Sequence, residues 1–297
     1  MDLYQITGLV LFAFAFAFYI LVLVLKQRRL NFGFPAIFGS IFFALAGIFM
    51  AATGMDRNEL KLNLVNTVNA KSDSLVFLDG IGLIRGISMD AANNGHDLLY
   101  LNFKSTTPWA DLGASGGINA LAASNGSVYI SLLLDTTLLM FRNGEIVELG
   151  NLPGLAPNLA VLDDAERKIF STVHDDFFPL NILRLFVDQV AVNGTVQPLA
   201  LCIHHSNLYI SDNTRVLVMR NGKFIRSIGP LPPARRMQIW QDRYLVIVPL
   251  RKGSRTQIFT LDGEFLISIP GSNVDLAVSA QQLFLTDDTT ICIYELG

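Results

Sequence analysis

A unit of roughly 40 residues, the length of a propeller blade repeat, recurs along residues 54–297. Its most regular element is a short strand with an aromatic or aliphatic residue at its centre. The centres are Tyr100, Tyr129, Phe170, Tyr209, Val246 and Phe284, with successive spacings of 29, 41, 39, 37 and 38. One apolar strand precedes this element and a strand pair follows it in several units. A period near 40 with four strands per unit is typical of β-propeller blades, so the sequence predicts an all-β six-bladed propeller.

Tight-turn dipeptides separate the predicted strands. Asn-Gly occurs five times and Asp-Gly twice, and both pairs favour the positive φ angles of two-residue hairpins. They lie at residues 79–80, 94–95, 125–126, 143–144, 193–194, 221–222 and 262–263. The last unit, residues 282–296, stops before its fourth strand, whereas residues 60–68 alternate apolar and polar side chains. We therefore expect a propeller over residues 60–297, in which strand 60–68 completes the final blade.

Residues 207–229, NLYISDNTRVLVMRNGKFIRSIG, resemble an NHL repeat. The pattern is an apolar strand, an Asp, a short turn, an Arg with a second apolar strand, Asn-Gly, and a last strand ending near Gly. Residues 282–296 are similar but shorter. The resemblance implies a propeller fold and no particular reaction, because NHL-like propellers serve as binding platforms, lyases or hydrolases.

The first 53 residues differ from the rest in composition. No charged residue occurs between Asp2 and Lys26 or between Arg29 and Asp56. Each uncharged stretch is long enough for a membrane-spanning helix, so we predict a two-helix transmembrane hairpin over residues 1–53, with spans at 6–25 and 34–52. Residues 54–59 would form the linker to the propeller. A cleaved signal peptide is the alternative for the first span, but basic residues follow its apolar core instead of preceding it.

Lys26, Arg28 and Arg29 lie in the short loop between the spans, whereas residues 1–5 contain no Lys or Arg. Basic loops face the cytoplasm, which predicts a membrane protein whose termini and propeller lie on the periplasmic, lumenal or extracellular side. The net charge of −3 divides into +2 for residues 1–53 (three basic, one acidic) and −5 for residues 54–297 (19 basic, 24 acidic). An acidic propeller does not fit nucleic acid as a partner.

The second span has small residues on one helical face, and the spans contain no ionisable residue of the kind transporters use. The face is formed by Ala36, Ser40, Ala44, Gly47 and Ala51. Such a face allows close helix approach. It would pack either against the first span or against helices of a larger membrane complex.

The channel of a propeller is a common ligand site, and polar residues lie near the starts of its predicted inner strands. They are Arg85, Asn119, Asn158, Gln197, Arg235, Arg236, Asn273 and Asp275. Calcium-dependent lactonases on six-bladed propellers resemble this outline, with Asn119, Asn158 and Asp275 as the alternative metal ligands. Because the arginines in this set would repel a cation, we expect a structural lining, with no catalytic residues, metal or cofactor.

Three further features have local interpretations. His204 and His205 would point to opposite faces of a strand, and we expect them at a solvated turn. His174, Asp175, Asp176, Phe177 and Phe178 predict a loop for contact with protein or membrane. Cys202 and Cys292 belong to different predicted blades, so we expect free thiols and no disulfide.

These features favour a membrane-anchored propeller that acts as a non-catalytic accessory or scaffold subunit. Its partners would be integral membrane protein subunits and the lipid bilayer, with protein contacts on the non-cytoplasmic side. The alternative is an enzyme that uses the channel, either a calcium-dependent lactonase-like hydrolase or a quinoprotein-type dehydrogenase. A small-ligand sensor is less favoured, because the cytoplasmic loop is too short for an output domain.

Overall fold

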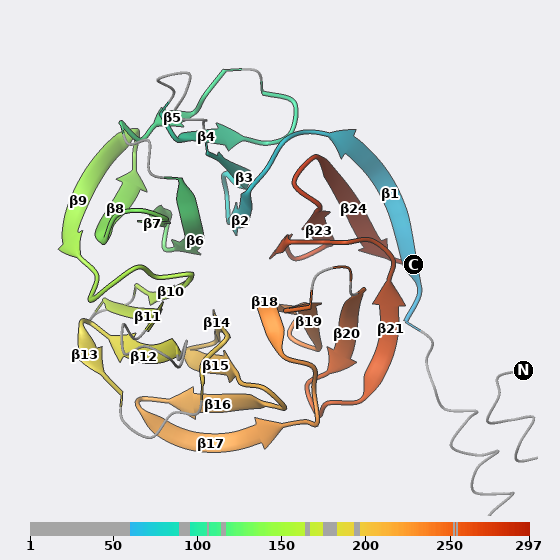
Figure 1. Ribbon diagram of the computed structural model, residues 1–297. Coiled ribbons are helices and arrows are strands. Elements are labelled where there is room, and N and C mark those ends of the chain that lie inside the picture. Colours follow the sequence, from blue (N-terminus) through green and yellow to red (C-terminus); the bar gives the residue numbers. More distant parts are fainter. Residues whose placement is uncertain are drawn as a thin grey trace, which may run out of the picture. The chain divides into compact units, whose positions relative to one another are not determined.

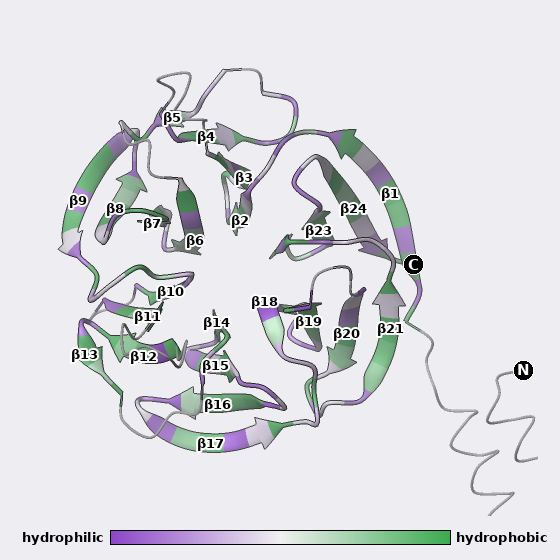
Figure 2. Cartoon of the chain, in the orientation of Figure 1, coloured by the Kyte–Doolittle hydropathy of each residue, from purple (hydrophilic) through white to green (hydrophobic). Residues whose placement is uncertain are grey.

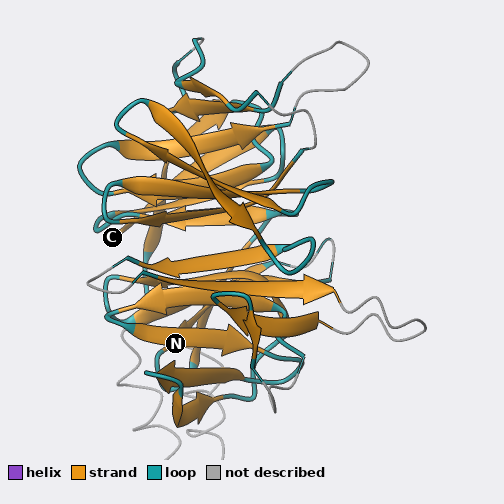
Figure 3. Cartoon of the chain, turned by 90° about the vertical axis from the view of Figure 1, so that its left-hand side faces the viewer, coloured by secondary structure: helices purple, strands orange, loops and turns teal. Residues whose placement is uncertain are grey.

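The computed structural model describes residues 60–88, 96–105, 107–113, 117–163, 167–174, 183–192, 197–251, 253 and 255–297. The predicted hairpin of residues 1–53, its two spans and the linker 54–59 lie outside the described residues. Within the described residues there is no helix of the length and apolarity needed to cross a membrane. That part of the chain consists of strands, turns and loops (Figure 3).

Six four-stranded antiparallel sheets surround a central axis as the blades of a propeller (Figure 1). Blade 1 comprises β2 (Ser74–Leu78), β3 (Gly82–Ile87), β4 (Leu98–Leu101) and β5 (Ala110–Asp111). Blade 2 comprises β6 (Ile118–Ser124), β7 (Ser127–Leu132), β8 (Thr137–Arg142) and β9 (Glu145–Asn151). Blade 3 comprises β10 (Asn158–Leu162), β11 (Lys168–His174), β12 (Leu183–Val187) and β13 (Val190–Ala191).

The remaining blades follow the same order from the axis outward. Blade 4 comprises β14 (Ala200–His204), β15 (Asn207–Ser211), β16 (Val216–Arg220) and β17 (Lys223–Ile228). Blade 5 comprises β18 (Ala234–Trp240), β19 (Tyr244–Pro249), β20 (Thr256–Thr260) and β21 (Phe265–Ile269). Blade 6 comprises β22 (Asp275–Val278), β23 (Gln282–Thr286), β24 (Thr290–Leu296) and, as its outer strand, β1 (Leu62–Asn69).

β1 closes the ring. It pairs with β24 from Leu62 opposite Leu296 to Asn69 opposite Thr290, with one irregularity between Leu64 and Asn66. Backbone bonds extend the contact at both ends, from Gly297 N to Lys61 O (2.8 Å) and from Ala70 N to Thr289 O (3.0 Å). The first and last strands of the described chain therefore share one sheet, and blade 6 is assembled from both ends of the propeller.

The core lies between blades. Each neighbouring pair of blades shares a cluster of buried apolar side chains, because a sheet buries its faces only against the next sheet. Between blades 4 and 5, for example, Tyr209 and Val218 pack with Met237 and Leu245. The cluster between blades 3 and 4 has only five buried members among the described residues: Ala160, Leu185, Leu201, Leu208 and Ile210.

Turns form at all five described dipeptides, but only the three Asn-Gly pairs form two-residue hairpins, whereas the Asp-Gly pairs lie in longer connections. Asn125, Asn143 and Asn221 have φ angles of 44°, 53° and 50°, and the glycine that follows each also has positive φ. Two successive positive φ angles define the type I′ hairpin, which matches the twist of the strands it joins. The pairs at 94–95 and 193–194 lie outside the described residues.

The alignment of the first blade from sequence was wrong. Tyr100 lies in β4, the third strand of its blade, whereas the other five aligned centres lie in second strands. The second strand of blade 1 is β3, which carries Arg85 between Ile84 and Gly86 and lacks an aromatic centre. The sequence alignment therefore placed β4 where β3 belongs. This explains why the spacing from Tyr100 to Tyr129 is the shortest of the five.

Removal of β1 is expected to destabilise the propeller. A chain of residues 70–297 should have a free energy of unfolding at least about 3 kcal/mol below that of residues 60–297, since Leu60 and Leu62 pack against the core of blades 5 and 6. Chemical denaturation measures the difference. As a control, Leu64→Ser with Val65→Ser in the longer chain should change stability little, because these side chains are 55% and 52% exposed. Equal stability of the two chains would contradict the role of β1.

Candidate functional site

The inner strands β2, β6, β10, β14, β18 and β22 surround the axis (Figure 1). Each lies beside the inner strand of the next blade. Three residues that the sequence placed near the starts of these strands, Asn158, Arg236 and Asp275, line one small cavity of about 30 Å³. We call these three residues the channel cluster. The cavity has room for about one water molecule, so the cluster nearly fills the channel at this level.

Arg236 is the centre of the channel cluster. Its Nη1 donates to the carbonyl oxygens of Pro157 (3.0 Å) and Arg235 (3.2 Å) and to Oδ1 of Asn158 (2.7 Å). Its Nη2 donates to the carbonyl oxygen of Asn119 (3.1 Å). Its Nε lies 3.4 Å from Oδ1 of Asp275. The guanidinium of blade 5 thus contacts blades 2, 3 and 6 across the axis.

Asp275 is the carboxylate partner, and its side chain is 7% exposed. Oδ2 accepts the backbone N–H of Leu75 in blade 1 (3.0 Å), and Oδ1 accepts that of Leu276 (2.8 Å). Burial raises the pKa of Asp275, while Arg236 and these two N–H groups oppose the rise. Since a buried charge needs compensation by pairing and hydrogen bonds, Arg236 and the two amides act together to hold the carboxylate.

Asn158 extends the network to blade 4. Its Nδ2 donates to the carbonyl oxygen of Leu199 (2.6 Å), directly before β14, and to Oγ1 of Thr172 (3.2 Å). Together the bonds of the channel cluster reach all six blades, with Leu75 in blade 1, Asn119 in blade 2 and Leu199 at blade 4 as the outer partners. The cluster is therefore a polar clamp at the centre of the ring.

The described residues do not fit a calcium ion at this position. Of the three residues proposed as its ligands, Asn158 and Asp275 line the cavity, but Oδ1 of each faces the guanidinium of Arg236. Asn119 faces the same group with its backbone carbonyl oxygen. Calcium requires six to eight oxygen ligands, and a fixed positive charge among them repels a second cation. The guanidinium of Arg236 supplies the positive charge that a metal ion would otherwise supply at this position.

The side chains of other polar residues named from the sequence have partners outside the channel cluster. Arg85 lies on β3 and is 4% exposed; its guanidinium donates to the carbonyl oxygens of Lys71, Asn102 and Ser105 and stacks over Tyr100. The expectation that Arg85 lines the channel was wrong, because the first blade was aligned one strand too late. Asn273 donates to Thr256, Gln197 accepts from Asn213, and Arg235 is exposed.

Beyond the clamp, the channel widens to a cavity of about 200 Å³. All six inner strands contribute to its walls, from Val76 on β2 to Val278 on β22. Most of the described side chains in this lining are apolar, and Ser124 and Gln238 are among the polar ones. The surface exposed to the cavity is nevertheless mainly polar, which suits ordered water.

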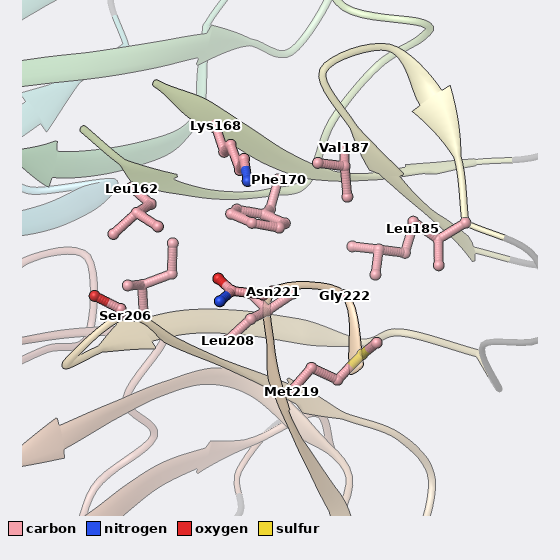
Figure 4. A pocket seen from close by; sticks show the side chains of 12 residues that line it. Leu162, Lys168, Phe170, Leu185, Val187, Ser206, Leu208, Met219, Asn221 and Gly222 are labelled. Atoms are coloured by element: carbon pink, nitrogen blue, oxygen red, sulfur yellow. The ribbon is translucent and has the colours of Figure 1, made fainter. Parts of the chain in front are cut away.

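A separate cavity of about 320 Å³ lies between blades 3 and 4, where the shared core is small. Figure 4 shows side chains from β10, β11 and β12 facing those of blade 4 across this space. The lining is apolar except for Lys168, Ser206 and Asn221. Among the described residues, β13 has only two residues, so blade 3 contributes little outer sheet to this interface.

His204 and His205 lie at a turn, as the sequence predicts, but they do not diverge. His205 has a φ of 47° and starts the turn after β14, so its ring leaves the alternation of the strand. The two ring centroids are 4.0 Å apart. Asp242, which the sequence argument missed, lies beside them from the turn after β18. No sequence pattern indicates this contact, because the two turns meet only when blade 4 packs against blade 5.

The described structure bears on only some of the remaining expectations. The helix face of Ala36, Ser40, Ala44, Gly47 and Ala51 and the basic residues Lys26, Arg28 and Arg29 lie outside the described residues. The loop of Asp175, Asp176, Phe177 and Phe178 and the side chain of His174 lie outside them too. Cys202 and Cys292 are both free. Burial raises the pKa of the Cys202 thiol to about 12, which makes it unreactive at neutral pH.

Comparison with known proteins supports the fold. The chain matches no family model, and no curated protein is significantly similar to it. A gluconolactonase from Xanthomonas campestris is similar over 83% of this chain and 93% of its own, with 14% identity and a TM-score of 0.58. The Pan2 WD40 domain of Neurospora crassa is similar over 80% and 96%, with 8% identity and a TM-score of 0.50.

BamB from Moraxella catarrhalis has a similar outline, over 80% of this chain and all of its own, with 10% identity and a TM-score of 0.47. The likeness to the gluconolactonase and to the Pan2 domain shows the fold alone, because propellers serve many unrelated functions. The chain is therefore a six-bladed β-propeller. Its NHL-like character stays a prediction from residues 207–229.

Loss of the central arginine should destabilise the ring. Arg236→Met is expected to lower the free energy of unfolding by about 3–5 kcal/mol, because it leaves the buried carboxylate of Asp275 without its cation. Arg235→Met is the matched control and should have a small effect, since Arg235 is exposed. Adding Asp275→Asn to Arg236→Met should restore part of the loss. Denaturant unfolding of the four proteins measures these values, and equal effects at 235 and 236 would refute the clamp.

Proposed function

We propose that this protein is a membrane-anchored, NHL-like propeller that acts as a non-catalytic accessory or scaffold subunit of a larger membrane complex. The propeller would lie on the periplasmic, lumenal or extracellular side and bind protein partners there. The observation that carries the proposal is the clamp of Arg236. It nearly fills the channel at the residues that the lactonase-like alternative would use as metal ligands, and its hydrogen bonds and ion pair reach all six blades.

The outer surface offers the contact area that such a role needs. Eight of the 13 exposed large hydrophobic residues in the described chain lie on the outermost strands of blades. They are Leu64, Val65, Ile146, Val147, Val190, Phe224, Ile225 and Phe265. Figure 2 shows hydrophobic and hydrophilic residues alternating along outer strands such as β9 and β17. They are distributed over the outer strands of five blades, with neighbouring pairs on β1, β9 and β17.

Phe224 and Ile225 on β17 give the strongest case on this perimeter. They are 62% and 49% exposed. The neighbouring hairpin of blade 5 is held against β17 by Arg226, which contacts Oδ1 of Asp262 and the carbonyl oxygen of Leu261 at 3.0 Å each. Phe265, 51% exposed, begins β21 directly after that hairpin. Blades 4 and 5 thus expose aromatic side chains on neighbouring outer strands, and the contacts of Arg226 hold the two blades together there.

The membrane part of the proposal rests on the sequence. Residues 6–25 and 34–52 are uncharged and long enough to span a bilayer. Lys26, Arg28 and Arg29 between them favour a cytoplasmic loop. The small-residue face around Ala44 and Gly47 fits close contact with another transmembrane helix.

Changes on this helical face should separate the protein from its membrane partners. In gentle-detergent purifications of the full chain, Ala44→Leu should reduce stoichiometric partner subunits at least about fivefold, because a larger side chain blocks close helix contact. Ala46→Leu is the matched control, since position 46 lies roughly 200° around the helix from position 44. Quantitative mass spectrometry measures recovery. Equal recovery with both variants would show that the face does not bind the partner.

A change on the perimeter tests the soluble side of the same proposal. Phe224→Asp should reduce recovery of the partner, because it places a charge in an apolar contact. Ser227→Asp adds the same charge to an exposed position of β17 and should leave recovery unchanged. If Phe224→Asp retains the partner fully, β17 is not the contact surface.

A further inference from the structure

Two neighbouring turns bring three metal-ligating side chains together at the edge of blades 4 and 5. His204 ends β14, His205 begins the turn to β15, and Asp242 lies in the turn between β18 and β19. β14 and β18 are inner strands that lie side by side (Figure 1). Both turns follow the ends of these strands, so they meet at the same end of the channel wall.

The three side chains are spaced as metal ligands are. Nε2 of His204 lies 3.0 Å from Oδ1 of Asp242, and Nε2 of His205 lies 3.8 Å from the same oxygen. One ligand atom from each residue lies within 4.8 Å of the other two. Ligand atoms on a tetrahedral zinc ion are about 3.3 Å apart, given bonds of about 2.0–2.1 Å. The two observed distances lie on either side of this value, so small side-chain rotations would complete the geometry.

The hairpins hold these residues in place. His205 and Ser206 have φ angles of 47° and 60°, and Gln241 and Asp242 have φ angles of 53° and 56°. Each turn is set by strand pairing, with His204 opposite Asn207 and Trp240 opposite Tyr244. The ligands therefore come from rigid sheet ends, which is the arrangement that favours a preorganised site.

The ligand types suit a transition metal. The side chain of His204 is 20% exposed, whereas those of His205 and Asp242 are 68% and 66% exposed, so solvent reaches the cluster. Two imidazole nitrogens and one carboxylate oxygen match zinc, nickel or copper, whereas calcium and magnesium prefer oxygen ligands alone.

We propose that His204, His205 and Asp242 form a binding site for a divalent transition metal of the zinc class, which bridges blades 4 and 5. Three protein ligands leave the fourth position of a tetrahedral ion to water or to a side chain of a partner. The site is separate from the Arg236 clamp, and the proposal does not depend on the scaffold function.

Zinc binding by the full chain in detergent tests the site. The protein carries no histidine tag and is stripped with a chelator, and zinc chloride is then titrated by calorimetry. We expect one equivalent to bind, with at least about tenfold weaker binding in His205→Asn and in Asp242→Asn. Asparagine suits both positions, because it tolerates positive φ better than most residues. Circular dichroism of each metal-free variant checks that the fold is retained.

The control is His96→Ala. His96 forms an exposed pair with Asp111, with 2.9 Å between Nδ1 and Oδ1, and no third ligand lies beside them among the described residues. It should bind zinc as the wild type does. Cobalt, as a spectroscopic substitute, should show tetrahedral absorption in the wild type and in His96→Ala and lose it in the other two variants.

Each alternative outcome overturns the proposal. If zinc does not bind the wild type, the cluster is only an ion pair between imidazole and carboxylate. If zinc binds the wild type, His205→Asn and Asp242→Asn equally well, the metal lies elsewhere in the chain. A loss of binding in His96→Ala of the same size would show non-specific chelation by surface histidines.

Discussion

The structure depends on closing a ring of sheets that cannot bury their faces alone. Each blade shares its apolar surface with two neighbours, and six clusters of buried side chains lie between them. Such a ring is stable only when its ends join, since an open ring exposes two sheet faces. The pairing of β1 with β24 provides the joint. It assembles one blade from the two ends of the propeller and links opening of that blade to opening of the ring.

The centre of the ring is held by polar contacts, unlike the apolar interfaces between the blades. Six inner strands bring backbone carbonyl oxygens and amides toward one axis, and one arginine satisfies several of them. Arg236 contacts three blades directly, while Asp275 and Asn158 extend the network to blades 1 and 4. A positive charge fixed among these oxygens does the electrostatic work that a cation would otherwise do. Through these bonds the channel cluster joins the blades at the centre of the ring.

The blade interfaces are not equivalent. Between blades 3 and 4 the described core is small and a cavity of about 320 Å³ remains, whereas blades 4 and 5 share a larger cluster. Blades 4 and 5 also carry the exposed aromatic residues of β17 and β21 and the turns with His204 and Asp242. A metal ion at those turns would add a bond between two blades that already share a large buried cluster. The cavity at the other edge of blade 4 leaves that interface less well packed.

Local sequence patterns were sufficient to predict the propeller fold and many of its turns. The period near 40, the Asn-Gly turns at 125, 143 and 221 and the apolar alternation of residues 60–68 are local features, and the propeller with its type I′ turns follows from them. The same patterns misplaced β3, because a strand with Arg85 at its centre lacks the aromatic signature. They also predicted that Asn158, Arg236 and Asp275 lie near the channel, but they did not indicate that Arg236 would bind the other two side chains.

Which groups meet across the axis, and that Asp242 reaches His204 from another blade, depends on how the blades pack. Those contacts join residues that are distant in the sequence, in the extreme case Leu75 and Asp275. A repeat pattern records the strands of each blade but not the distances between blades, and only the closed ring sets those distances.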